Sequence, residues 1–195
     1  YRKAIEINPN YAEAHSDLGN LLKELGHLQD AELSIRKAIE INPNYAEAHS
    51  NLGIILNDLG NLKEAELLLR KAIELSPNLA IAHYNLGNIL IDLRKLNEAE
   101  LSLRKAIKLD PNLALAHSSL GNTLSRLGKT KEAELELRTA NELNPNNKNF
   151  KNNLIQFLTL YEPEKIDLNP LYKVNEEFKN LNLSYQENIY IPDNE

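Results

Sequence analysis

The sequence predicts an all-α protein, a solenoid of helix hairpins stacked side by side. The first observation is a strict period, marked by Pro9, Pro43, Pro77, Pro111 and Pro145, each 34 residues after the last. The second is near-identity between copies, because the fifteen residues at 2–16, RKAIEINPNYAEAHS, stand again at 36–50. The third is a helical spacing of apolar residues between the prolines. A fixed period of this length is typical of repeat proteins whose units bury their apolar faces against neighbours.

Residues 46–79 indicate how each unit is built. Apolar side chains at helical spacing predict one helix before Gly60 and a second helix after it. Pro77 ends the second helix, because proline cannot continue a helix and disfavours helical geometry in the residue before it. Each unit is therefore predicted to be a hairpin of two helices joined by a tight turn.

The start of the first helix carries a capping pattern. We expect Asn44 to cap the helix, with Glu47 three residues later in the manner of a capping box. The same pair stands one period earlier. In the two later units the acidic position is taken by Ile81 and Leu115.

Small residues recur inside the predicted helices. The first helices carry Gly19, Gly53, Gly87 and Gly121, and the second helices carry Ala31, Ala65, Ala99 and Ala133. A glycine costs about 1 kcal/mol in the middle of a helix. Its presence in every unit therefore predicts the close approach of a neighbouring helix.

This combination of Leu-Gly, a glycine turn, two alanines and a proline at 34-residue spacing resembles the tetratricopeptide repeat (TPR), in the form of a bacterial consensus-like array. The resemblance covers a partial repeat at 1–11, units at 12–45, 46–79, 80–113 and 114–147, and a closing helix at 148–161. It implies antiparallel helix hairpins that form a right-handed superhelix. Residues 162–195 are expected to hold a linker, a short helix and a tail, or to begin another domain.

Two features depart from the family pattern. Arg94 replaces the usual turn glycine, and we expect it to strain that turn. Histidines occupy the slot of the usual tryptophan, at His15, His49, His83 and His117. Equivalent residues on stacked helices lie roughly 8–10 Å apart, whereas the ligands of one metal ion all reach it at about 2.1 Å. We therefore expect these histidines to pack, and we expect no metal and no cofactor.

Charge patterning predicts a solvated outer face. Each second helix carries a glutamate four residues before an arginine, the favoured helical pairing, at Glu32–Arg36, Glu66–Arg70, Glu100–Arg104 and Glu134–Arg138. Because each arginine has an acid within reach, a phosphate-binding stripe is the weaker interpretation.

Composition excludes several functional classes. The net charge of −6 argues against a nucleic-acid partner, since such proteins usually carry a basic face. No apolar run approaches the roughly 18 residues of a membrane span, and no signal-peptide pattern begins the chain. With neither a span nor a signal peptide we expect a cytoplasmic protein, and with no catalytic motif we expect that it is not an enzyme. With no methionine and a first residue inside a repeat, the chain is expected to be a segment of a longer protein.

The family resemblance implies a site on the inner face of the first helices, a concave groove that holds extended peptides. The candidate residues are Asn20, Asn51, Ile54, Tyr84, Asn85, Asn88, Ile91 and Asn122. An amide both donates to and accepts from a peptide backbone. The row looks similar to the asparagine ladder of the O-linked N-acetylglucosamine transferase TPR region, although asparagine is also a common solvated residue. The apolar members predict either a binding hot spot or a contact with the C-terminal helix of the same chain.

The leading hypothesis is a protein–protein interaction scaffold that binds a protein or an extended peptide in the groove. The alternative is the substrate-recruiting TPR region of a larger glycosyltransferase- or sulfotransferase-type enzyme whose catalytic domain is not in this chain. We expect a monomer, because the closing helix covers one end of the array, with self-association through an open end as the alternative.

Overall fold

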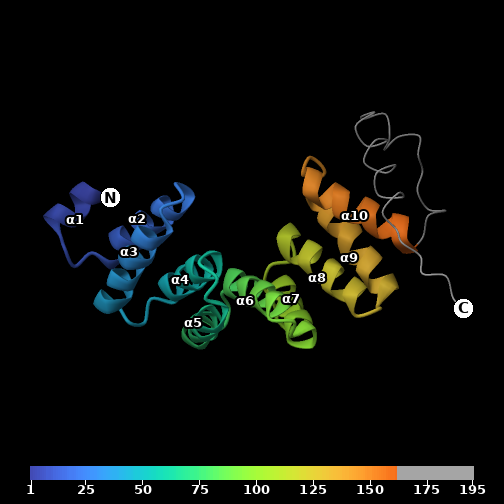
Figure 1. Ribbon diagram of the computed structural model, residues 1–195, viewed down its shortest axis with the longest axis horizontal. Coiled ribbons are helices and arrows are strands. Elements are labelled where there is room, and N and C mark those ends of the chain that lie inside the picture. The colour runs from blue at the N-terminus through green and yellow to red at the C-terminus, as the bar shows by residue number, and fades with distance from the viewer. Residues whose placement is uncertain (162–195) are drawn as a thin grey trace, which may run out of the picture. The chain divides into compact units, whose positions relative to one another are not determined.

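The computed structural model describes residues 1–161, which form ten α-helices and no strand (Figure 1). The helices are α1 Arg2–Ile7, α2 Ala12–Glu24, α3 Leu28–Ile41, α4 Ala46–Asp58, α5 Leu62–Leu75, α6 Ala80–Asp92, α7 Leu96–Leu109, α8 Ala114–Arg126, α9 Thr130–Leu143 and α10 Lys148–Tyr161. Tyr1–Phe157 form one compact unit, and the boundary with Leu158–Glu195 falls inside α10. The linker, short helix and tail predicted for 162–195 lie outside the described residues.

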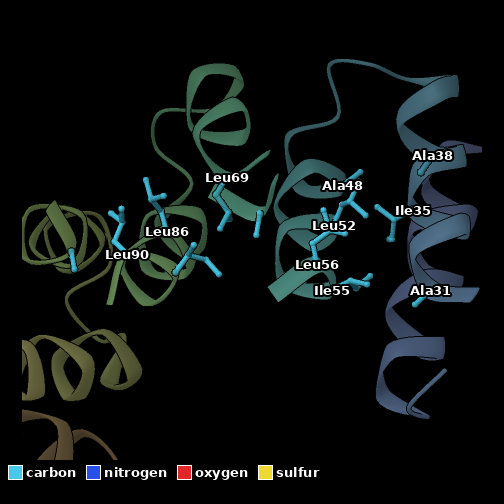
Figure 2. Packing of buried hydrophobic residues seen from close by; sticks show 13 residues of the cluster. Ala31, Ile35, Ala38, Ala48, Leu52, Ile55, Leu56, Leu69, Leu86 and Leu90 are labelled. Carbon is cyan, nitrogen blue, oxygen red and sulfur yellow. The ribbon is translucent and has the colours of Figure 1, made fainter. Parts of the chain in front are cut away.

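The predicted all-α hairpin architecture is confirmed. Each first helix packs against the second helix of its own hairpin, as α2 packs on α3 and α4 packs on α5. Each second helix then packs on the next first helix, and successive first helices also contact one another. Figure 2 shows the resulting core, in which Leu52, Ile55 and Leu56 of α4 lie between Ile35 of α3 and Leu69 of α5. Because this core is shared between neighbours, it runs continuously from hairpin to hairpin.

The helical glycines mark the closest approach within each hairpin, as predicted. A Cβ atom placed on Gly87 would lie 2.6 Å from Cγ of Leu103 in α7, and Gly53 has the same relation to Leu69 at 2.8 Å. Both leucines are fully buried. The neighbour that requires the glycine is therefore the second helix of the same unit.

The turns inside the hairpins confirm the strain expected at Arg94. Gly26, Gly60 and Gly128 have φ angles of 80°, 82° and 76°, and a Cβ on any of them would meet nothing within 4 Å. These turns therefore need glycine for its backbone conformation alone. Arg94 adopts the same conformation with φ 60°, which is unfavourable for a residue that has a Cβ.

The predicted capping by Asn44 is wrong. Tyr45 occupies the N-cap position of α4, and no side chain caps that helix. The backbone N–H of Asn44 instead donates to Oδ1 of Asn42 at 3.2 Å. Asn42 precedes Pro43 and has extended backbone angles, which place its side chain over the following turn. The same Asx turn recurs before two other prolines, from Asn8 to Asn10 and from Asp110 to Asn112. Asn147 lies three residues later in its repeat, directly before α10, where its Oδ1 accepts from the backbone N–H of Asn149.

Candidate functional site

The first helices share one surface, which we call the first-helix face. On α2 it consists of Glu13, Ser16, Asp17, Asn20 and Lys23, and it continues at the residues 34, 68 and 102 positions later. These spacings of three and four residues place the side chains on one side of a helix. Contacts between α2 and α4, α4 and α6, and α6 and α8 join the four segments into one surface.

All eight predicted groove residues lie on these first helices. Asn20 comes from α2, Asn51 and Ile54 from α4, four residues from α6, and Asn122 from α8. Asn122 is exposed and Asn85 is buried, while the other six are partly buried. The side chains therefore differ in what they offer to a partner.

Asn85 joins two first helices. Its amide donates to Oγ of Ser50 at 3.4 Å, and Asn85 is only 9% exposed. Asn153 of α10 makes the same bond to Oγ of Ser118 at 3.0 Å. Sequence reasoning missed Asn153, although it stands two periods after Asn85 and continues the same row. Within residues 1–161 the amides of Asn20, Asn88 and Asn122 form no hydrogen bond, so they remain available to a partner.

The histidines hydrogen-bond each first helix to the proline-containing segment that precedes it. Nε2 of each ring donates to the carbonyl of the proline six residues earlier, at 3.0 Å in His15 and 2.8 Å in His49. His83 and His117 make the same bond at 3.0 Å. The expectation that these residues pack is confirmed. Among the described residues, no three His, Asp or Glu side chains converge as a metal site would require.

His117 differs from the other histidines because both of its ring nitrogens face acceptors. Nδ1 lies 2.6 Å from Oε2 of Glu136, while Nε2 faces the carbonyl of Pro111. The carbonyl accepts only, and so does the Glu136 carboxylate when it is ionised, so this geometry favours the imidazolium form, in which both ring nitrogens donate. The Glu136 carboxylate, opposed by burial and assisted by the Pro111 carbonyl, raises the pKa of His117. In the second unit Leu68 stands where Glu136 does, and Nδ1 of His49 is buried without a partner.

The second helices carry an ordered set of ion pairs. The predicted pairs within each helix are present, for example Arg70 to Glu66 at 2.8 Å. Sequence reasoning missed a second set that crosses between units, in which Arg70 also binds Glu98 and Lys95 binds Glu66. Lys95, opposed by burial and assisted by Arg70, lowers the pKa of Glu66. Arg36 and Arg104 repeat the crossing bond, to Glu64 and Glu132. The four arginines of these helices are therefore each paired with a glutamate within the chain, which leaves none of them free to hold a phosphate.

Comparison with known protein families explains the hairpins. Models of the tetratricopeptide repeat match residues 1–26, 16–80, 80–113 and 102–135. The chain belongs to the tetratricopeptide repeat family. The TPR match accounts for the proline joints, the turn glycines and the close-packed helical glycines. No curated protein matches the chain.

Solved TPR structures share the fold. MamA is 27% identical with a TM-score of 0.65, over 73% of this chain and 84% of that one. YrrB, described as a TPR protein with an unusual peptide-binding site, is 24% identical with a TM-score of 0.68, over 94% and 97%. A Thermobaculum terrenum O-GlcNAc transferase mutant is 28% identical with a TM-score of 0.64, over 67% of this chain and 26% of that one. This chain therefore matches about a quarter of that transferase.

The helices described here include none that is both long and apolar enough to cross a bilayer.

Proposed function

We propose that this TPR chain is an interaction scaffold that binds an extended peptide along its first-helix face. The observation that carries the proposal is the row of unengaged amides, Asn20, Asn88 and Asn122, on a surface built from consecutive first helices. The different character of the second helices supports it, because their arginines are already paired with glutamates of the neighbouring unit. YrrB supports the fold alone, since its identity is below a quarter, so the proposal depends on this chain's own residues.

The spacing of the units suits an extended chain. Packed helices lie about 8–10 Å apart, and an extended peptide advances about 3.3 Å per residue. Each unit therefore faces about three peptide residues. An amide that donates and accepts meets the backbone at each step, which favours binding with little dependence on side-chain sequence. Ile54 interrupts the row and offers an apolar contact between two amides.

A peptide library tests this proposal. We expect random peptides displayed on phage to yield ligands for the immobilised chain, with affinities then measured by fluorescence anisotropy. The variant Asn20→Ala, Asn88→Ala, Asn122→Ala removes three hydrogen bonds worth about 1 kcal/mol each, so binding should weaken on the order of 100-fold.

A matched control alters amides on the second helices. The variant Gln29→Ala, Asn97→Ala changes exposed residues of α3 and α7 and should bind as the parent chain does. Equal binding by the parent chain and the triple asparagine variant would refute the proposal that the peptide binds along the first-helix face. The pair Tyr84→Ala, Asn88→Ala provides a second test at the centre of the face.

A second candidate function comes from the transferase comparison. The chain would then recruit substrates for a catalytic domain encoded beyond Glu195, of the glycosyltransferase or sulfotransferase type. The partial match to O-GlcNAc transferase favours the glycosyltransferase version. Sequencing the gene downstream of Glu195 tests it, and an immediate stop codon would exclude such a domain on that side.

A further inference from the structure

One exposed position of the first-helix face changes its chemistry along the array. It is the second residue of each first helix, occupied by Glu13 in α2, Glu47 in α4, Ile81 in α6 and Leu115 in α8. All four side chains are exposed, and the two apolar ones are exposed by 41% and 46%. The face therefore begins with charge on α2 and α4 and ends with apolar side chains on α6 and α8. Figure 1 shows these four helices in order along the chain.

The charged part gathers three carboxylates from two helices. Glu13, Asp17 and Glu47 all act electrostatically on the Tyr45 phenol, which interacts with the Ser16 hydroxyl. Burial first, and then the negative charge of these three groups, raises the pKa of Tyr45. Lys23, the basic residue of this face on α2, lies ten residues after Glu13, about 15 Å farther along the helix.

These carboxylates are unpaired, unlike the glutamates that form the ion pairs of the second helices. Within residues 1–161, none of the three takes part in an ion pair, whereas Glu66 and Glu100 each bind two cationic side chains. An unpaired group of like charges repels itself and attracts an incoming cation. The charge on the first-helix face is therefore available to a partner.

The apolar part departs from the residue types of the earlier units. Ile81 and Leu115 stand where the earlier units carry glutamate, and Tyr84 stands where every other unit carries serine. Tyr84 and Ile91 are only partly buried in α6. Exposed aliphatic residues grouped around one aromatic residue are typical of binding hot spots.

We propose that the first-helix face takes an extended peptide of two-part chemistry, with Lys or Arg residues over α2 and α4 and apolar or aromatic residues over α6 and α8. The two parts of the face lie two units apart, about 20 Å, which an extended chain crosses in about six residues. The acidic part steers and orients the peptide, and the apolar part holds it. This inference rests on the peptide-binding function proposed above and names its ligand class.

Synthetic peptides test the inference directly. We would label four peptides and titrate each with the 195-residue chain by anisotropy. The first carries three Lys or Arg residues, a three-residue polar spacer and three apolar residues, so that the centres of its basic and apolar blocks lie six residues apart. The second replaces the basic residues with Glu, the third omits the spacer, and the fourth scrambles the order. An extended chain can lie in either direction, so the reversed order is measured as well. The spaced basic peptide, in one of its two directions, should bind at least tenfold more tightly than the other three.

Variants with matched controls locate the contact. Glu13→Gln, Asp17→Asn, Glu47→Gln should weaken the spaced basic peptide at least tenfold and flatten its salt dependence. The control Glu6→Gln, Asp30→Asn, Glu142→Gln makes the same charge change on exposed residues of α1, α3 and α9, and should bind normally. An equal loss of affinity in both triple variants would mean that the peptide is attracted by the net charge of the chain, and it would overturn the inference.

The apolar part has its own control. Ile81→Ser, Leu115→Ser should weaken binding, while Leu67→Ser, Leu101→Ser on α5 and α7 should not, although those leucines are 68% and 70% exposed. Circular dichroism checks that each variant is folded.

The two proposals fail differently. Binding that needs Asn20, Asn88 and Asn122 but ignores peptide charge and spacing would refute the two-part ligand and leave the groove intact. Binding that ignores all three asparagines would refute both.

Discussion

Adding one methyl group at Gly87 tests the packing between the two helices of a unit. In Gly87→Ala the new Cβ lies 2.6 Å from Cγ and 2.8 Å from Cδ2 of Leu103. Leu103 is fully buried, so it has no solvent to turn into. Overpacking of this kind costs about 1–3 kcal/mol, and alanine's helix propensity returns about 1 kcal/mol. We expect the free energy of unfolding to fall by up to about 2 kcal/mol.

Urea denaturation followed by circular dichroism measures this change, and a double-mutant cycle assigns its cause. Leu103→Ala alone should cost about 2–5 kcal/mol by leaving a cavity. In the double variant the added methyl group fills part of that cavity, so the combined loss should be smaller than the sum of the two single losses. Additive losses would refute the reasoning that Leu103 is what requires the glycine. Repeat arrays can unfold unit by unit, so the cycle uses the transition of the whole curve.

Three further changes are predicted. Arg94→Gly should raise the free energy of unfolding by about 0.5–1 kcal/mol, because glycine relieves a left-handed residue at a partly offsetting entropic cost; an unchanged urea midpoint would contradict this. The raised pKa of His117 means that its pairing with Glu136 stabilises the fold fully below the unfolded pKa of about 6.5, and that this stability is lost as pH rises through the folded pKa. Glu136→Gln should therefore flatten the fall in Tm measured from pH 5.5 to 8.5, and parallel curves for both chains would exclude the pairing. Lys95→Gln should cost about 0.5–1 kcal/mol in 20 mM salt and less in 500 mM, as measured by urea denaturation, because its partner Glu66 is partly exposed; a loss independent of salt would show that packing is responsible.

The hairpins were predictable because several independent signals repeat with the same period. Proline ends one helix, glycine permits the turn, and Gly87 with its equivalents marks the tight contact. Each signal acts within a few residues or within one hairpin, so the sequence alone is enough to place it. Even the strained turn at Arg94 could be predicted from a single missing glycine.

Features that depend on side-chain direction were harder to predict. Asn42 and Asn44 flank the same proline, and residue type alone does not tell which one turns over the joint. The bond from Asn85 to Ser50 and the ion pair from Arg70 to Glu98 join residues 35 and 28 positions apart. Those separations depend on how one hairpin is set against the next, and no periodicity within a helix encodes that. The sequence predicted which positions form the candidate site, whereas only the structure showed that Asn85 is already hydrogen-bonded to Ser50.

The crossing ion pairs make the array tolerant of changes in length. Arg36, Arg70 and Arg104 each bind a glutamate of the unit after their own, always 28 residues further along the chain. Removing residues 46–79 would place Glu98 28 residues after Arg36, so the same ion pair would form at the new junction between units. The same deletion would bring Ile81 beside Glu13 and shorten the distance between the acidic and apolar parts of the face to about three peptide residues. Gain or loss of a whole repeat could thus change ligand spacing during evolution without a new fold having to arise.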